Sequence, residues 1–372
     1  MVSHIQHDPL AKRAGRIAYA GILGAHAVAS IPSSGRGTTP RLFFGGARTG
    51  DHGGPLVKIQ RLKARFGQHL WRYNIAYVLS NAPYLPGLAL DLLKARGIPI
   101  VHNQNGVFYS AWYDGDWWQQ NRRMARSFHS AQHVFYQSEF CRQAADRFLG
   151  IRKRPGEVLY NAVDTRRFHP QADAAKRPAG GFTFLLTGKI DAHLFYRVQS
   201  TLQGLAEARK RGLEAKLVIA GGLDQAAGNA TRQLIADLKL DGCTRIVGPY
   251  SQIEAPMLYA SAHAYVTTKH QDPCPNAVLE ALACGLPVLY SNTGGVPELV
   301  GTEAGVALDC DEDWERPHVP STSDIADGML RIAERAGEMS GAARKRAVSL
   351  FDIRHWLNRH DWIFRQLLQQ RR

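Results

Sequence analysis

The chain has 372 residues, of which 45% are hydrophobic and 21% charged, as in ordinary globular proteins. A single hydrophobic core rarely serves more than about 250–300 residues, so we expect two domains. The five cysteines show no CxxC spacing, which argues against a disulfide framework or a structural zinc site and indicates a reducing compartment.

The positive charge is concentrated in the first half of the chain. Residues 1–175 contain 23 Lys/Arg and 10 Asp/Glu, a net charge of +13, whereas residues 176–372 contain 23 and 22, a net charge of +1. This excess favours an anionic partner: a membrane surface, an acidic glycan, a phosphate-bearing acceptor or nucleic acid. The alternative is a surface charge that only keeps the chain in solution. Since neither half contains a recognisable nucleic-acid-binding module, we predict no nucleic-acid partner.

No segment reaches the roughly 20 apolar residues that a membrane span requires. Residues 17–31 follow three basic residues and resemble a weak signal peptide, but two glycines and His26 interrupt the apolar run. We therefore interpret residues 1–39 as an extension ahead of the first core strand.

Strands and helices alternate in the next part of the chain. The expected strands are 41–45, 74–80, 98–101, 133–138 and 158–160, and the expected helices are 56–66, 87–96 and one that opens at Glu139. This alternation predicts parallel βαβ units.

Residues 171–181 are small and polar and include Pro178 and two glycines, so we predict a linker there. The alternation then resumes, with strands at 183–187, 216–220, 245–247, 264–267 and 287–290, helices at 199–211, 231–238, 256–261 and 277–283, and a closing helix at 353–370. We predict an α/β fold of two Rossmann-like domains that face a cleft, with ligands at the carboxyl ends of the strands.

The segment from Asp272 to Glu298 contains the most specific pattern. Asp272 follows a strand, and Glu280 lies near the first turn of a helix. A carboxylate accepts hydrogen bonds from both hydroxyls of a vicinal diol, so either acid can hold a ribose or a hexose. The N–H groups around Asn276–Val278, at the helix N-terminus, favour a phosphate. The alternative is that Asp272 caps the helix and Glu280 is a surface acid that compensates the helix dipole.

Together with PCPN, ALACGLPV and GGVPE, these acids resemble the signature of retaining glycosyltransferases of family 4 (glycosyl transferases group 1), which have the GT-B fold. In that family two acids separated by seven residues are followed by EAxAxGxPV, a Gly-Gly loop and a Glu. The resemblance covers roughly Arg41 to the end. It implies that Glu280 binds the nucleotide ribose and that Asp272, where the family more often has Glu, contacts the donor sugar.

The resemblance also implies that the two domains bind different substrates. Residues 40–175 would bind the acceptor, residues 176–352 would bind the nucleotide-sugar donor, and residues 353–372 would form a helix that packs back on the first domain. The implied catalytic residues are Asp272, Glu280 and Lys189. The implied donor-binding residues are Gly188, Lys189, Arg197, Gly221, Gly222, Asn276, Ala277, Val278 and Glu280.

The loop that follows strand 183–187 departs from the family pattern. Family members usually have Gly-Arg and, six residues later, a Lys, and the two cations hold the donor diphosphate. Here Lys189 takes the place of the Arg and Phe195 that of the Lys, while Arg197 lies two residues further on. Lys189 can act as a compact phosphate-binding charge without the bidentate fork of an arginine. The alternative is a surface lysine and a helix arginine.

Two segments of the first domain are candidates for the cleft. The glycines before helix 56–66, Gly53 and Gly54 among them, let backbone N–H groups approach a ligand closely. After strand 98–101, our register places Asn105 where the family often has a histidine, and an Asn can hydrogen-bond a sugar hydroxyl. His102, three residues earlier, is either a cleft residue or a buried core histidine.

Aromatic residues follow in the same domain. They are Trp112, Tyr113, Trp117 and Trp118. They either form a platform for an acceptor sugar or lipid or pack a loop.

We therefore expect a retaining transferase that moves a hexose-type sugar from a nucleotide sugar, UDP- or GDP-linked, to a glycan or lipid-linked acceptor of a cell-surface polysaccharide or lipopolysaccharide. No bound cofactor or metal is expected. We expect a cytoplasmic protein, which the basic first domain would bring to the inner face of the membrane. The alternatives are a non-catalytic sugar-nucleotide-binding protein and a GT-B epimerase or phosphorylase.

Overall fold

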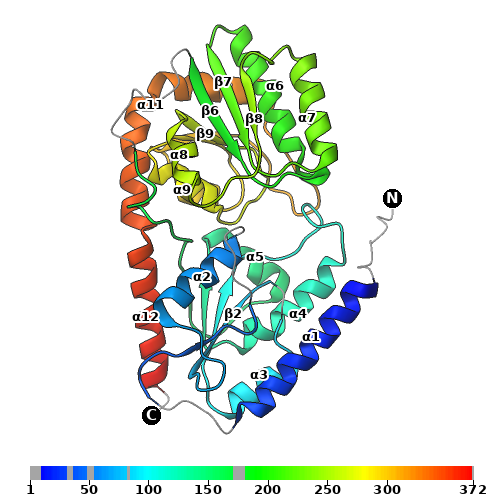
Figure 1. The fold of residues 1–372 in the computed structure, drawn as a ribbon, viewed down its shortest axis with the longest axis vertical. Helices are drawn as coiled ribbons and strands as arrows, with labels where there is room; N and C mark the ends of the chain where they lie inside the picture. The colour runs from blue at the N-terminus through cyan, green and yellow to red at the C-terminus, as the bar shows by residue number, and fades with distance from the viewer. Residues whose placement is uncertain (1–9, 32–36, 48–53, 82–83, 171–180, 371–372) are drawn as a thin grey trace. The chain divides into compact units, whose positions relative to one another are not determined.

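The computed structural model describes residues 10–31, 37–47, 54–81, 84–170 and 181–370. The chain divides into two compact units. The amino-terminal unit comprises residues 1–160, 314–316 and 354–372, and the carboxyl-terminal unit comprises residues 161–313 and 317–353. Each unit contains its own parallel sheet, so the predicted α/β class is confirmed (Figure 1).

The amino-terminal unit is built on five parallel strands in sequential order. The strands are β1 (Leu42–Phe43), β2 (Ile75–Leu79), β3 (Ile100–Gln104), β4 (His133–Tyr136) and β5 (Gly156–Val158). Every residue of β1 to β4 is buried, as expected for parallel strands that are covered on both faces.

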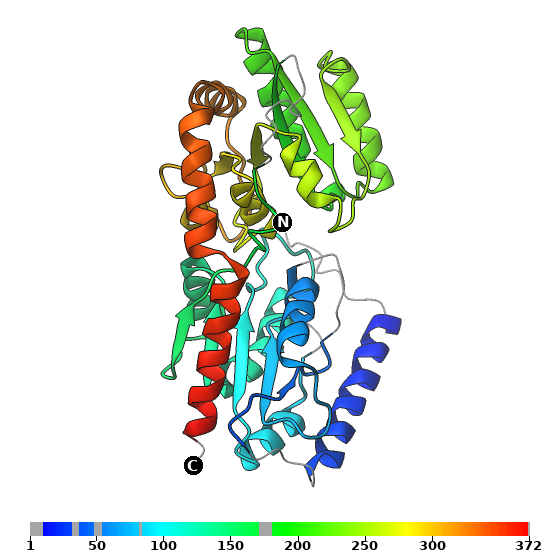
Figure 2. The ribbon, with the colours of Figure 1, turned by 60° about the vertical axis from the view of Figure 1, so that its left-hand side comes forward.

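Helices cover both faces of this sheet, as Figures 1 and 2 show. The helices are α1 (Leu10–Ala29), α2 (Gly54–Phe66), α3 (Gly87–Ala95), α4 (Trp117–Ser130), α5 (Glu139–Leu149) and α12 (Ile353–Gln369). Side chains from α1, α3, α4 and α5 share one buried cluster with alternate strand residues such as Ala76 and Val78. On the other face, Phe364 of α12 packs edge-on against Phe66 of α2 and Tyr77 of β2.

Helix α1 was not predicted from the sequence. It includes residues 17–29 of the segment that resembles a signal peptide. The helix packs beside α3, and Leu23 and Ala27 are buried. His26 stacks on Phe43 at 4.8 Å between ring centroids. None of the described helices is long and apolar enough to cross a membrane.

One short piece of the later chain belongs to the amino-terminal unit. Trp314 lies stacked on Phe140, with 5.2 Å between ring centroids, and edge-on to Tyr109 at 4.8 Å. Its carbonyl accepts a hydrogen bond from the Ala111 N–H at 3.0 Å. Residues 314–316 therefore share the core of a sheet that ends more than 150 residues earlier in the sequence.

The carboxyl-terminal unit contains six parallel strands in the order β11-β10-β9-β6-β7-β8. They are β6 (Phe182–Thr187), β7 (Ala215–Ala220), β8 (Thr244–Val247), β9 (Ala264–Thr267), β10 (Val288–Ser291) and β11 (Gly305–Leu308). From β6 the chain first builds outward to β8 and then returns to β9 on the other side. This is the doubly wound order 3-2-1-4-5-6, in which ligands bind where the direction reverses, here between β6 and β9.

Two sets of helices cover this second sheet. The helices are α6 (Tyr196–Lys210), α7 (Gln225–Asp237), α8 (Ala255–Ala260), α9 (Asn276–Ala283), α10 (Val296–Val300) and α11 (Thr322–Leu350). Helices α6, α7 and α11 share one buried cluster with residues such as Leu186 and Leu217. Helix α9 contacts β9 and β10 and lies next to α8 and α10.

The predicted strands and helices all occur, with ends shifted by a few residues. Strand β3 runs on through His102 to Gln104, beyond the predicted end at Val101. The predictions omitted α1, α4, α10, α11 and β11. The proposed linker lies almost wholly outside the described residues.

Candidate functional site

The candidate residues of the carboxyl-terminal unit gather at the carboxyl ends of β6, β7, β9 and β10. Lys189 follows β6, and Asp272 and Glu280 follow β9, so these residues flank the point where the strand order reverses. Gly221 and Gly222 follow β7, the neighbour of β6. The sheet thus brings together residues that are up to 91 positions apart in sequence.

The loops after β6 and β7 are tied to each other by backbone hydrogen bonds. The Gly188 N–H donates to Ala220 O at 3.0 Å, and the Ile190 N–H donates to Gly222 O at 2.8 Å. Gly221 has φ +125°, and a Cβ there would lie 2.0 Å from Gly188 O, so only glycine fits. Lys189 lies between these two anchored neighbours and is itself exposed.

Arg197 lies beneath this loop rather than in it. The side chain extends from the first turn of α6, is 6% exposed, and donates from Nη2 to Thr187 O at 3.1 Å. A Cβ on Gly188 would be 3.0 Å from Arg197 Nη1. The guanidinium therefore stabilises the end of β6 through this hydrogen bond. Its role as a second phosphate-binding cation stays a prediction, and Phe195, in the family's lysine place, precedes α6.

The loops after β9 and β10 interlock in a similar way. The Gln271 N–H donates to Thr293 Oγ1 at 3.1 Å, and the Gly295 N–H donates to Asp272 O at 3.0 Å. Gln271 has φ +48°, which is uncommon for a residue other than glycine. Strained backbone of this kind is concentrated at functional sites.

Asp272 forms an ion pair that the sequence did not reveal. Lys269 Nζ lies 2.8 Å from Asp272 Oδ2, with 15% of the Asp272 side chain exposed. The pair leaves the second carboxylate oxygen for another donor. Helix α9 has Pro275 at its N-cap and no side-chain cap, so the alternative that Asp272 caps this helix is wrong.

Glu280 is the fifth residue of α9, close to the first turn as predicted, and is 6% exposed. It is therefore not a surface acid. Burial raises the pKa of Cys284 to about 12, and the Glu280 carboxylate contributes in the same direction. Burial also raises the pKa of Tyr250, and Glu280 again adds to the effect. The Glu280 carboxylate is therefore buried beside a thiol and a phenol, Cys284 and Tyr250, that both stay neutral at pH 7.

The start of α9 provides polar groups beside these acids. Asn161 Nδ2 donates to Cys274 O at 2.9 Å, which anchors the PCPN turn to the NAVD segment. The Val278 N–H donates to Pro275 O at 3.1 Å, so a phosphate there would use the N–H groups of Asn276 and Ala277. Asn276 Oδ1 is buried and has no hydrogen-bond partner among the described residues.

The amino-terminal unit has its own polar cluster at the carboxyl ends of its strands. Asn105 Oδ1 accepts hydrogen bonds from Lys58 Nζ at 2.8 Å and from Gln137 Nε2. The Asn105 N–H donates to Ser80 Oγ at 2.8 Å, and Nδ2 donates to Asn81 Oδ1 at 3.2 Å. Residues after β2, β3 and β4 thus meet around Asn105, at the end of the sheet where ligands bind.

Sequence analysis predicted only Asn105 of this cluster, and Lys58 is a charged member that it missed. It extends from α2, is 4% exposed, and also donates to Asn103 Oδ1. Its neighbours Val57 and Ile59 are buried as well, so the apolar pattern of the helix gave no sign of a buried amine.

His102 lies inside β3 and has no exposed surface. Its Nε2 donates to Gln104 Oε1 at 2.8 Å, and burial lowers its pKa to about 3. Because no part of this side chain is exposed, we assign His102 to the core. Gly54 begins α2, and Gly53 lies outside the described residues.

The aromatic residues after β3 mostly pack against one another. Trp112 stacks on Phe108 at 5.0 Å between ring centroids and donates from Nε1 to Val107 O. Trp117 packs edge-on against Phe148 at 6.0 Å. Trp118 is 60% exposed. Packing therefore accounts for Trp112 and Trp117, and Trp118 is the tryptophan of this group that most faces solvent.

Two family models match the chain, one in each half. Residues 34–167 match the model described as Glycosyltransferase Family 4, and residues 181–332 match the model described as Glycosyl transferases group 1. The chain belongs to the family 4 glycosyltransferases. Residues 181–332 contain the loops around Lys189, Asp272 and Glu280.

Curated members of the family are similar over parts of the chain. A D-inositol 3-phosphate glycosyltransferase of Saccharomonospora viridis is 29% identical over 183 residues, which cover 46% of this chain and 41% of the relative. The O-antigen chain mannosyltransferase B of Escherichia coli is 33% identical over 87 residues, or 23% of each chain. The matches thus span less than half the length of these relatives.

A solved structure with the same architecture is HepE of Anabaena in complex with UDP and glucose. It has a TM-score of 0.60 and 17% identity, and the match covers 82% of this chain and 80% of that chain. At this identity the likeness concerns the fold alone, and the predicted GT-B fold is confirmed.

Proposed function

We propose that this glycosyltransferase transfers a hexose-type sugar, with retention of anomeric configuration, from a nucleotide sugar to a glycan or lipid-linked acceptor. The observation that carries this proposal is the convergence of Lys189, Asp272 and Glu280 at the reversal point between β6 and β9. A cation, two carboxylates and a helix N-terminus suit the diphosphate, the ribose and the sugar of such a donor.

Each donor group has a matching residue. The buried Glu280 would bind the ribose hydroxyls, and Asp272, held by Lys269, would contact the donor sugar. Lys189 and the N–H groups at the start of α9 would bind the diphosphate. Since charge develops on the diphosphate as the glycosidic bond breaks, stabilising that charge would supply most of the catalysis.

The acceptor would bind to the amino-terminal unit. Asn105, held by Lys58, presents an amide group at the carboxyl ends of the strands, which suits the hydroxyls of a sugar. The net charge of +13 over residues 1–175 favours an acidic or phosphate-bearing acceptor, or one held at an anionic membrane. A cell-surface polysaccharide or lipopolysaccharide intermediate has this chemistry, and cytoplasmic nucleotide sugars, UDP- or GDP-linked, would supply the donor.

The test is calorimetric binding of UDP-, GDP-, ADP- and dTDP-sugars. We expect one nucleotide class to bind, and Glu280→Ala to weaken that binding at least tenfold, because each lost hydrogen bond to a charged group is worth about 1.5–3 kcal/mol. Glu334→Ala, which removes an exposed carboxylate on α11 outside the signature segment, is the control. If no nucleotide sugar binds, the proposal fails.

A non-catalytic nucleotide-sugar-binding protein is the second candidate. The observation that favours it is that Arg197 is buried under β6 and Phe195 replaces the family's lysine, which leaves Lys189 as the cation of this loop. The distinguishing experiment incubates the protein with the bound donor and mixed acceptors and follows the anomeric protons by NMR. A transferase yields a product of retained configuration, an epimerase changes the donor without acceptor, and a binding protein leaves all the sugars unchanged.

A further inference from the structure

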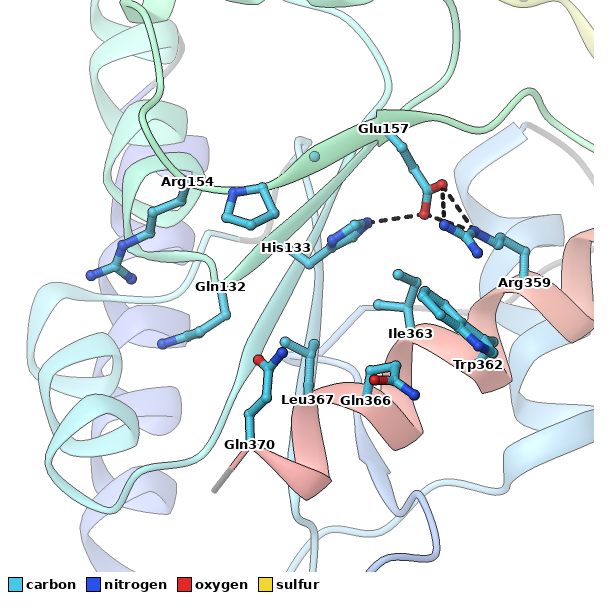
Figure 3. Close-up of a pocket in the computed structure, with 12 residues that line it drawn as sticks. Gln132, His133, Arg154, Glu157, Arg359, Trp362, Ile363, Gln366, Leu367 and Gln370 are labelled. Carbon is cyan, nitrogen blue, oxygen red and sulfur yellow. Dashed lines mark hydrogen bonds and ion pairs between the residues drawn. The ribbon is translucent and has the colours of Figure 1, made fainter. Parts of the chain in front are cut away.

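Another candidate site lies in the amino-terminal unit, away from the carboxyl ends of its strands. It is a cavity of about 650 Å³ between the edge of the sheet and α12, and its size is typical of pockets that take small molecules (Figure 3). Its lining includes Gln132, Glu157, Arg359, Trp362, Gln366 and Gln370.

This cavity opens at the amino ends of the strands. Gln132 directly precedes β4, and Arg154 and Pro155 directly precede β5. Asn105 and its partners lie at the opposite, carboxyl ends. Four residues of β4 separate the two ends, or about 13 Å at about 3.3 Å per residue. A ligand in the cavity would therefore not be at the reacting centre.

The charged groups in the cavity already neutralise one another. Arg359 Nη2 lies 2.7 Å from Glu157 Oε2, and His133 Nε2 lies 3.2 Å from Glu157 Oε1. Burial raises the pKa of Glu157, but the hydrogen bonds from His133 and Arg359 outweigh it, so the net shift is downward. The carboxylate therefore stays charged and paired, and the cavity interior does not require an ionic ligand.

The remaining groups match the two surfaces of a sugar ring. The amides of Gln366 and Gln370 can each donate and accept hydrogen bonds, as hydroxyl groups do, and Gln132, whose Oε1 accepts from the Ile100 N–H at 2.6 Å, can still donate from Nε2. Trp362 is 49% exposed, and the Arg359 guanidinium carbon lies 4.3 Å from its ring centroid. An indole fixed in this way offers a rigid apolar surface to the C–H face of a pyranose.

We propose that the cavity between β4, β5 and α12 binds a pyranose unit of an oligosaccharide. The site anchors a glycan at a distance from the reacting centre and raises the local concentration of its free end. Arg154, exposed at the rim, adds affinity for an acidic sugar. The anchoring role rests on the proposed transferase function, whereas the binding itself does not.

The experiment titrates the full chain, without nucleotide sugar, with four probes: maltotetraose, α-1,2-mannotetraose, β-1,4-galactotetraose and tetragalacturonate. We expect at least one probe to bind, and Trp362→Ala and Gln366→Ala each to weaken that binding at least tenfold. Trp362→Phe retains an aromatic surface and should recover most of the affinity. Gln369→Ala is the matched control, because Gln369 is an exposed amide on the same helix that does not line the cavity.

Binding of none of the four probes overturns the proposal, as does wild-type affinity in Trp362→Ala. If Trp362→Ala does not fold, Gln366→Ala and Gln369→Ala decide between the two outcomes. The same preparations are titrated with the nucleotide-sugar panel. Glycan binding without nucleotide-sugar binding contradicts the transferase and keeps this site, and the reverse result removes this site and keeps the transferase.

Discussion

The cationic side chains near the candidate site differ in what they contact. Arg197 and Lys58 are buried and hold backbone or amide oxygens, whereas Lys189 is exposed on a loop. Lys269 is partly exposed and pairs with Asp272. Substituting a buried cation should lower the stability of the protein, whereas substituting an exposed cation should weaken ligand binding. Two predictions at the residue scale follow from this difference.

Lys189→Ala should weaken nucleotide-sugar binding about tenfold, because it removes one charge from the diphosphate. It should change the free energy of unfolding by less than about 0.5 kcal/mol, because the side chain is exposed.

Arg197→Met should instead lower the free energy of unfolding by about 1–3 kcal/mol, because Thr187 O loses a buried donor. Calorimetry and urea unfolding measure both quantities. If Arg197→Met affects only binding, Arg197 contacts the diphosphate.

Lys58→Met should destabilise the protein by about 1–3 kcal/mol, because Asn103 and Asn105 each lose a buried donor. Urea unfolding monitored by circular dichroism measures the change. Lys94→Met is the control, since Lys94 is an exposed lysine on α3 with a 3.7 Å ion pair to Asp91. Equal effects of the two substitutions would contradict the structural role of Lys58.

Loops anchored to one another, more than the strands themselves, shape the candidate donor site. The loops after β6 and β7 exchange backbone hydrogen bonds, and the loops after β9 and β10 are joined by one backbone hydrogen bond and one to the Thr293 hydroxyl. Such pairs approach too closely for a side chain, so glycine is required at the point of contact.

Gly221→Ala should therefore be strongly destabilising, because the new Cβ would lie 2.0 Å from Gly188 O at a φ of +125°. We expect a loss of several kcal/mol, or a protein that does not fold. Gly222→Ala is the matched control: its added Cβ would meet nothing within 4 Å and its φ is not positive. Thermal unfolding of the two variants checks the difference. A similar melting temperature for both would show that the two loops are not held as closely as described.

Each of the two units has its own core, and the core of the amino-terminal unit contains two fully buried histidines that resist protonation. His360 of α12 and His102 of β3 belong to the amino-terminal unit and have no exposed surface. Tyr77 OH lies 3.0 Å from His360 Nε2, and His360 Nδ1 lies 2.8 Å from Trp356 O. Both contacts are satisfied by a neutral ring that donates from Nδ1. Burial lowers the pKa of each histidine to about 3.

Acid should therefore destabilise the amino-terminal unit. The unfolded chain takes up a proton near pH 6.5 and the folded unit does not until about pH 3, so this contribution is complete above pH 6.5 and is lost as the pH falls below it. At pH 5 the loss is on the order of 1–2 kcal/mol for each histidine.

Urea unfolding of the wild type and His360→Gln at pH 7 and pH 5 measures this effect. The stability advantage of the wild type over the variant should shrink at pH 5, because the variant lacks one titrating group. An advantage that stays constant between the two pH values would contradict a depressed pKa at His360.

Sequence patterns predicted the fold and the family correctly where the residues that define them lie close together in the chain. The βα alternation predicted both sheets, and the segment Asp272–Glu298 predicted the family, because its acids, turn and helix are contiguous. Helix α11 was missed because its apolar residues are interspersed with alanines and charges, and helix α1 because its apolar run reads as a targeting segment.

The sequence by itself therefore determined the α/β class, the family and the candidate donor loops, because local periodicity and contiguous motifs carry this information. Only the tertiary structure decided which polar side chains are buried and which face solvent. Burial depends on contacts between distant segments: Arg197 lies under β6, Lys58 reaches Asn105, and Glu157 pairs with Arg359 some 200 residues away. No local pattern records such contacts, because they form when parallel strands and their helices assemble.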